Sequence, residues 1–438
     1  MAITTIIDVF TILVSIYLAV KTVKKVGTSS RYVIYYFTFL ILVVPLILDY
    51  IIGKPDYLSW YGGRKHYGFI VSYDDPLTRI FYDAFLLLFQ FIILYCNHSN
   101  HEHLTVTDSI RLSNINNGWL FGIMAGFALL PVALVVLLPL NKMIMFIWGW
   151  RDSGLFNATS SKYYFTIEKL TYIGVACALL LVLTPANTFS FSTKYNERIF
   201  RWSKVLWVAI AYMDICIESK RSIIIFVLAV VITFLIDVIP RRKIGWILLC
   251  GMLFSAVIIG LSIFVKTTSR GYSDWISVYS TLRIDFFRDD TIKMLLYSIL
   301  HPGEIKVLNY PFESYIKQIP FLLPLNFTHI PRVGYNSYFT CAVLHVPFDP
   351  SINYITCSMF DEMLANFNLL AYLVAPIFTI WYSNKADQQT TVMRTMMVAG
   401  YVLMSMYSLH YIVWFVQIVF TILFFQKFRL KFGNKYLT

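Results

Sequence analysis

Four basic residues stand at places in this chain where positive charge is unexpected. Lys220 and Arg221 occupy a very short turn between two apolar segments, and Arg270 and Arg283 follow the apolar segment that ends near residue 265. A guanidinium is permanently charged, and its planar fork matches the oxygens of a phosphate. These residues are therefore candidates for binding a pyrophosphate. The simpler alternative is pairing with nearby acids, namely Asp214, Glu218, Asp274 and Asp285.

Carboxylates and histidines near helix ends are the candidates for a general base. Glu362 follows Asp361 immediately before an apolar segment, and His345 lies in the polar stretch that precedes them. Glu362 has the alternative role of stabilising a helix N-terminus. His345 has the alternative role of an ordinary polar loop residue. We take Glu362 as the predicted base and His345 as its competitor.

The sequence predicts no metal or cofactor site. The spacing of His98, His101 and His103 could bind a metal, but no cysteine or second cluster supports it. Asp289 and Asp290 are predicted to lie on a helix that also carries Arg283, and paired acids there usually form a solvated face. No nucleotide-binding glycine pattern is present.

Two of the six cysteines, Cys341 and Cys357, fall in the same polar stretch of the chain. They could form a disulfide in an oxidising compartment. Separation along the sequence does not decide whether their geometry allows the bond.

The elements that position these residues are predicted to be membrane-spanning helices. Of all residues, 58% are apolar and only 14% are charged, with a mean hydropathy of +0.66. Long unbroken apolar runs favour helices over an alternating β-barrel. The pattern predicts an all-α bundle of about 11 spans (range 10–12). The predicted spans are 3–20, 32–52, 80–96, 118–139, 170–190, 202–217, 222–239, 244–265, 367–383, 392–408 and 410–426.

The basic residues predict the orientation, because short loops rich in Lys and Arg stay in the cytoplasm. The N-terminus is then outside and the C-terminus inside. The chain divides into a bundle (1–265), a large outer loop with short helices (266–366), and C-terminal spans with a tail (367–438). The net charge of +12 is explained by this basic collar, so no nucleic-acid partner is predicted. The collar comprises Lys21, Lys24, Lys25, Arg31, Lys194, Arg198, Arg201, Lys204, Arg241, Arg242, Lys243, Lys427, Arg429, Lys431 and Lys435.

Three short segments resemble the O-antigen and capsule polymerases of bacteria. They are the turn 219–222 (Ser-Lys-Arg-Ser), the arginine-bearing stretch 266–285, and the segment 360–367 (Phe-Asp-Glu-Met-Leu-Ala-Asn-Phe) that leads into a late span. The resemblance in span pattern covers the whole chain. One departure is clear, because glycine usually follows the Asn-Phe pair in that family, whereas Asn368 follows it here.

The resemblance implies a metal-independent glycosyltransferase, without a cofactor, in the bacterial inner membrane. Such a protein moves a growing glycan from undecaprenyl pyrophosphate to the non-reducing end of a lipid-linked repeat unit at the outer face. Its partners are the two lipid-linked oligosaccharides, membrane lipids and a chain-length regulator protein. For this chemistry we assign the base to Glu362, with His345 competing. We assign pyrophosphate binding to Lys220, Arg221, Arg270 and Arg283.

Two other function classes remain open. An O-antigen ligase uses the same donor, but such proteins commonly show a His-Asn pair in the outer loop that this sequence lacks. A flippase or exporter of lipid-linked oligosaccharide is expected to show a pseudo-repeat, whereas here one long loop has no earlier counterpart.

Overall fold

The fold is known from a computed structural model. It describes residues 2–26, 28–55, 57, 66–96, 118–136, 173–183, 194–217, 229–230, 232–233, 276, 279–280, 283, 286–322, 333–353, 355–389, 391–408, 431–432 and 435–436. The chain forms two compact units. Unit 1 comprises 1–101, 235–387 and 401–411, and unit 2 comprises 102–234, 388–400 and 412–438.

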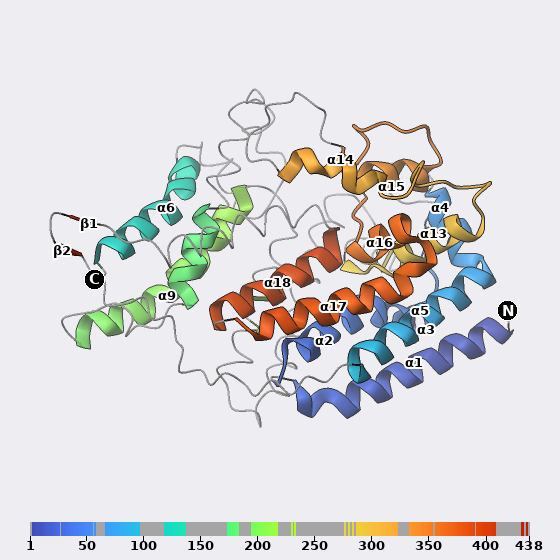
Figure 1. The fold of residues 1–438 in the computed structure, drawn as a ribbon, viewed down its shortest axis with the longest axis horizontal. Helices are drawn as coiled ribbons and strands as arrows, with labels where there is room; N and C mark the ends of the chain where they lie inside the picture. Colours follow the sequence, from blue (N-terminus) through green and yellow to red (C-terminus); the bar gives the residue numbers. More distant parts are fainter. Residues whose placement is uncertain are drawn as a thin grey trace. The chain divides into compact units, whose positions relative to one another are not determined.

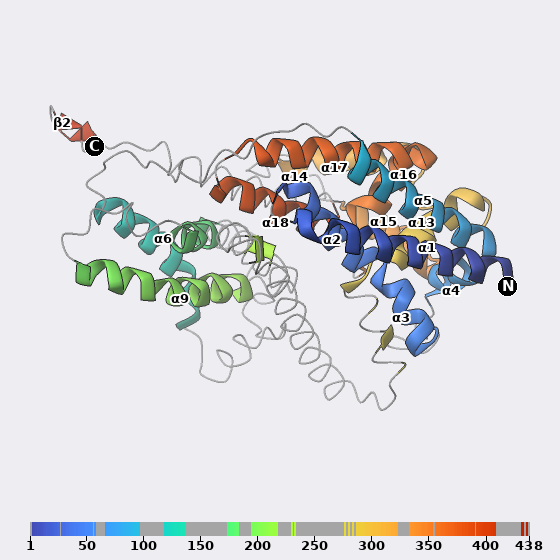
Figure 2. The same ribbon diagram turned by 90° about the horizontal axis from the view of Figure 1, so that it is seen from below.

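Unit 1 contains most of the described helices (Figure 1). They are α1 (Ala2–Thr22), η1 (Val23–Lys25), α2 (Ser30–Leu42), α3 (Val44–Ile52), α4 (Tyr67–Asp74), α5 (Pro76–Tyr95), α13 (Asp289–Leu300), α14 (Glu313–Leu322), α15 (Tyr335–Leu344), α16 (Met359–Phe367), η4 (Asn368–Leu370), α17 (Ala371–Asp387) and the end of α18 (Thr391–Tyr407). Helix α5 packs on α1, α13 and α17, and α13 also packs on α4 and α16. Figure 2 shows α1 and α5 from below.

Unit 2 contains α6 (Gly118–Val136), α9 (Lys194–Ile217) and a helical stretch at 173–183. The ring of Phe121 in α6 meets those of Phe200 and Trp207 in α9, with centroids 6.0 and 6.1 Å apart. The strands β1 (Lys431–Phe432) and β2 (Lys435–Tyr436) form a two-residue antiparallel pair. Every other regular element in the described ranges is helical, as the sequence predicts.

Four described segments are long and apolar enough to cross a membrane, and they match four predicted spans. They are Ile3–Lys25, Ser30–Ile52, Pro76–Tyr95 and Met359–Asp387. Shorter apolar helices, Phe121–Ala133 and Ile173–Leu183, fall in two further predicted spans. The predicted spans 202–217 and 392–408 are helical in α9 and α18. The spans 244–265 and 410–426, and most of 222–239, lie outside the described residues, so the total of eleven stays a prediction.

Helix α1 has the polarity of a membrane helix, with its apolar side chains outward and its polar side chains inward. The exposed stripe is formed by Ile3, Ile6, Phe10, Leu13, Tyr17 and Val20. The buried stripe is formed by Thr4, Asp8, Thr11, Ser15, Leu18 and Thr22. Water would favour the reverse arrangement, because buried polar groups are costly there and exposed apolar groups gain nothing. Both stripes are the pattern expected of a helix surrounded by lipid.

The ends of the span helices gather in two groups: α1, α5 and α17 run in one direction, and α2 and α3 run in the other. At one end Arg31, which begins α2, donates to the carbonyl oxygens of Ile93 (3.3 Å) and Cys96 (2.9 Å) at the end of α5. At the same end the backbone N–H of Ser30 donates to Asp387, where α17 ends, at 2.8 Å. The opposite end holds α4 and α13. It is also where α1, α5 and α16 begin and α3 ends.

Candidate buried charge cluster and open pocket

A proline break between α2 and α3 creates the first part of the site. Pro45 lies in the first turn of α3 and has no N–H, so the carbonyl oxygen of Ile41 four residues earlier lacks its helical donor. The backbone N–H of Arg288, just before α13, donates to that oxygen at 3.1 Å. The hydroxyl of Tyr82 in α5 donates to the neighbouring carbonyl oxygen of Leu42 at 2.8 Å. The break thus fixes the start of α13, and α5, against the end of α2.

The Arg283 guanidinium is fully buried against three carboxylates. Its Nε and Nη2 donate to the two oxygens of Asp290 at 2.9 and 2.6 Å, a bidentate pair. Nη2 also donates to Asp289, and Nη1 donates to Asp49 of α3. The carbonyl oxygen of Pro45 is 3.4 Å from Nη1. Each of the five N–H donors of Arg283 therefore has an acceptor inside the protein.

Asp49, Arg283, Asp289, Asp290 and Lys293 form what we call the charge cluster. Lys293 Nζ donates to Asp289 at 3.0 Å. Three carboxylates against two cations leave one excess negative charge in a buried site. Tyrosine hydroxyls surround the cluster: Tyr57 donates to Asp290, and Tyr73 and Tyr279 donate to Asp49.

Burial and neighbouring charge separate the titration of the two paired acids. Burial raises the pKa of Asp289 to about 6, against the opposing effect of the Arg283 guanidinium. Burial acts in the same direction on Asp290, but the Arg283 and Lys293 charges outweigh it and hold the pKa of Asp290 below its usual value. Asp289 is therefore the group of this pair that takes up a proton first as the pH falls.

Two expectations about this region are wrong. Asp289 and Asp290 do not form a solvated face, because α13 is covered by α4, α5 and α16 and the two acids are 0% and 6% exposed. The single helix predicted over Arg283 and both acids is interrupted, since Phe287 and Arg288 are not helical. That interruption lets Arg283 fold back onto the first turn of α13. Among the described residues, no group of three or more His, Cys, Asp or Glu could hold a metal ion.

The predicted base Glu362 lies in α16 and is 0% exposed. Asp361 beside it caps the same helix in a reciprocal capping box with Ser358, and it accepts a hydrogen bond from Thr291 of α13 at 3.2 Å. Asp361 therefore begins α16 and joins it to α13. Glu362 does not open onto solvent in this structure.

The Asn-Phe pair after these acids holds α16 against α14. The amide nitrogen of Asn366 donates to Ser314 of α14 at 2.8 Å. The ring of Phe367 lies 5.1 Å from that of Phe312, edge to face. Asn368 then has φ 54° and ψ −143°, a conformation that favours glycine. The position where glycine was expected keeps a glycine-like backbone with asparagine in place.

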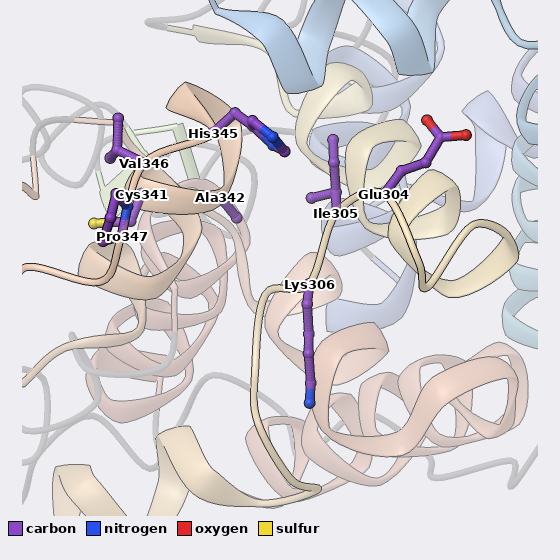
Figure 3. Close-up of a pocket in the computed structure, with 8 residues that line it drawn as sticks. All are labelled: Glu304, Ile305, Lys306, Cys341, Ala342, His345, Val346 and Pro347. Carbon is purple, nitrogen blue, oxygen red and sulfur yellow. The ribbon is translucent and has the colours of Figure 1, made fainter.

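His345, the competing base, opens onto a pocket of about 320 Å³. The pocket is lined by Glu304, Ile305, Lys306, Cys341, Ala342, His345, Val346 and Pro347 (Figure 3). His345 ends α15 in the left-handed conformation, with φ 55°. Its imidazole is turned toward the segment after α13 that carries Glu304. Glu304 and Lys306 were not predicted at this place, because they lie about 40 residues before His345 in the sequence.

Three of the predicted pyrophosphate-binding residues, Lys220, Arg221 and Arg270, lie outside the described residues. The histidines 98, 101 and 103 and the acid at 285 lie outside them as well. Of the described site residues, Arg283 and Glu362 are sealed and His345 is accessible. Cys341 and Cys357 are both free thiols, so the disulfide allowed by the sequence is not formed.

Comparison with known proteins found no relative of this chain. Family models, curated protein sequences and solved structures gave no match to this chain. The described residues therefore show a helical protein with four segments suited to crossing a membrane. A buried charge cluster lies at one end of these segments, and an open pocket lies at His345.

Proposed function

We propose that this protein is a bacterial surface-polysaccharide polymerase that transfers a glycan from undecaprenyl pyrophosphate to a lipid-linked repeat unit. The observation that carries the proposal is the meeting of two of the resembling segments on one helix. Arg283 belongs to the first segment and bonds to the first turn of α13. Asp361 belongs to the other, 78 residues later, and accepts from Thr291 of α13. Segments that share a site are expected to converge in this way.

The proposed orientation places the charge cluster at the outer face. The helix ends at Lys21, Lys25 and Arg31 form the basic group, and positive residues favour the cytoplasm. The opposite ends, with α4, α13 and the pocket, then face outward, and the N-terminus lies outside. Eleven spans and a location in the inner membrane complete this proposal.

The proposed chemistry needs a base, a pyrophosphate site and no metal. The acceptor hydroxyl attacks the anomeric carbon of the donor, the bond from that carbon to the pyrophosphate oxygen breaks, and undecaprenyl pyrophosphate leaves. His345 takes the hydroxyl proton, because it opens onto the pocket whereas Glu362 is sealed. Lys306, on the opposite wall, supplies positive charge for the departing phosphates.

The roles of the arginines follow from their surroundings. Arg283 is a positioning residue in this proposal, since its N–H groups already donate to Asp49, Asp289 and Asp290. Lys220, Arg221 and Arg270 keep the pyrophosphate-binding role assigned to them above. The donor and acceptor are both lipid-linked oligosaccharides, and a chain-length regulator is the expected protein partner.

The test is gel analysis of surface polysaccharide from the host strain after deletion of the gene. Deletion is expected to remove the ladder and leave single repeat units, and wild type is expected to restore the ladder. His345→Ala, present in the membrane at the wild-type level, is expected to restore none. Two matched variants, Val346→Ala in the same pocket and His301→Gln on the half-exposed loop after α13, are expected to restore it.

Two outcomes would overturn the assignment. Surface glycan that disappears entirely, with lipid-linked units trapped on the inner face, would identify a flippase or exporter. Polymerised glycan that accumulates on the lipid carrier without reaching lipid A core would identify a ligase. A ladder restored by His345→Ala would leave the polymerase in place and remove His345 as its base.

A further inference from the structure

A second set of charges lies inside the span helices, away from the pocket. Asp8 of α1 and Asp83 of α5 belong to two candidate membrane spans, and they are 3% and 1% exposed. An ionised carboxylate in such a place is costly unless a partner compensates it. The two acids differ in the partners they have.

Asp8 is fully compensated. The Arg79 guanidinium donates to Oδ2 of Asp8, and the hydroxyl of Tyr50 in α3 donates to the same oxygen at 2.8 Å. Arg79 carries one positive charge, and its ion pair with Asp8 uses that charge. A second ionised carboxylate nearby would therefore have no cation of its own on α5.

Asp83 has no such compensation. Neither of its carboxylate oxygens receives a hydrogen bond from a donor in the described parts of the chain. Lys293 acts on Asp83 through space, but its ammonium donates to Asp289 at 3.0 Å. The side chain within hydrogen-bonding reach of Asp83 is the carboxyl group of Asp8. Two ionised carboxylates in contact repel each other, whereas a carboxylic acid donates a hydrogen bond to a carboxylate.

We propose that Asp8 and Asp83 share one proton and form a proton-binding site within the membrane-spanning helices. The proton resides on Asp83, which donates it to the carboxylate of Asp8. The described ionisable groups that interact with the pair come from three helices: Tyr50 of α3, Arg79 and Tyr82 of α5, and Lys293 of α13.

The site links the protonation state to the attachment of α1. Asp8 lies on the buried polar stripe of α1, and further along that stripe Ser15 accepts a hydrogen bond from Gln90 of α5 at 2.8 Å. Loss of the shared proton leaves two negative charges, with Arg79 between α1 and α5 as the one cation bonded to them. Repulsion between the acids then opposes the polar contacts that hold the two helices together.

The experiment is infrared spectroscopy of the purified full-length chain in lipid nanodiscs. At neutral pH the wild type is expected to show the carbonyl band of a buried protonated carboxylic acid. Asp83→Asn is expected to lose this band while keeping the wild-type melting temperature, because asparagine also donates a hydrogen bond to Asp8. Asp83→Glu is expected to retain a band, and so is Asp74→Asn, which changes an exposed acid paired with Lys54.

Alkali cations are the competing ligand, so the spectra are recorded in sodium chloride and in choline chloride. The proposal expects the same band in both salts. A band present in choline and lost in sodium would show an alkali-cation site and overturn the proton assignment. A wild-type spectrum identical to that of Asp83→Asn would show that both acids are ionised, and this result would also overturn the proton assignment. If Asp83→Asn does not fold, Asp83→Glu is used in its place. Its longer side chain is expected to shift the carbonyl band, and an unshifted band would overturn the proposal.

Discussion

Replacing Arg283 by methionine is expected to destabilise the protein by about 3–5 kcal/mol, because the change leaves buried acids without their cation. Methionine keeps an unbranched apolar chain but removes every donor. Asp49, Asp289 and Asp290 then remain in a site that is almost closed to solvent, with side-chain exposures of 9%, 0% and 7%. Lys293 bonds to Asp289 and cannot replace three contacts.

The magnitude follows from the geometry of the ion pairs. Arg283 and Asp290 form two parallel hydrogen bonds of 2.6 and 2.9 Å in a buried site, where each unpaired charge is expensive. Neutralising the acid should therefore recover part of the loss. The double variant Arg283→Met with Asp290→Asn is expected to be less destabilised than the two single effects added together, with a coupling of about 0.5–3 kcal/mol.

The assay is thermal or denaturant unfolding of the purified protein in lipid nanodiscs, without added ligand. Lys54→Met is the matched control, because it removes a cation whose pair with Asp74 is exposed, with side chains 60% and 63% exposed. The Lys54 ammonium also lies 5.1 Å from the centroid of the Tyr73 ring. That exposed pair is expected to contribute less than about 1 kcal/mol. A large loss of stability for Arg283→Met and a small one for Lys54→Met would show that the buried Arg283 holds the charge cluster together.

The opposite pattern would refute the reasoning. If Arg283→Met is as stable as wild type, and inorganic pyrophosphate raises the melting temperature of wild type but not of the variant, Arg283 binds the ligand directly. The carboxylates around it would then have to release the guanidinium before the ligand binds, and the positioning role assigned above would be wrong.

Two further predictions concern the acid pair and the backbone after α16. Because burial raises the pKa of Asp289 to about 6, stability should increase as the pH falls from 7 toward about 4 and be lost again as the pH rises through 6. The wild type should show this trend in unfolding experiments and Asp289→Asn should show a weaker one. Asn368→Val should cost about 1–3 kcal/mol because of the positive φ, whereas Asn368→Gly should stay within about 1 kcal/mol of wild type.

The sequence predicts the span helices well because lipid imposes one strong rule on them. A segment that crosses lipid must satisfy its backbone internally and present apolar side chains outward, so length and hydropathy suffice. The predicted span 32–52 illustrates the limit of that rule. Pro45 divides it into α2 and α3, and the carbonyl oxygen of Ile41, which has no helical donor, accepts a hydrogen bond from Arg288. A hydropathy average does not register that consequence.

The charge cluster could not be predicted in full from the sequence, because Asp49 is remote from the other members and the nearby acids meet Arg283 only where the predicted helix is interrupted. The acid that meets Nη1 of Arg283 is Asp49, 234 positions earlier, while the acids suggested by proximity were Asp274 and Asp285. The local sequence identifies which charged groups need a partner, but the packing of the helices determines which partner each one meets.

Asp361 shows the converse case, a local pattern that was not among the predictions. It stands three residues after Ser358 at the start of an apolar run, which is the spacing of a capping box, and the structure contains that box. Arg283, Glu362 and Asp361 look alike in sequence as charged residues near helix ends. They separate in structure because Asp361 bonds to Ser358 of its own turn, whereas Arg283 also bonds to Asp49 of α3, far away in the sequence. A charged residue with no local partner is therefore the better marker of a long-range contact, and Asp83, which has none among the described donors, is where the same argument leads to a bound proton.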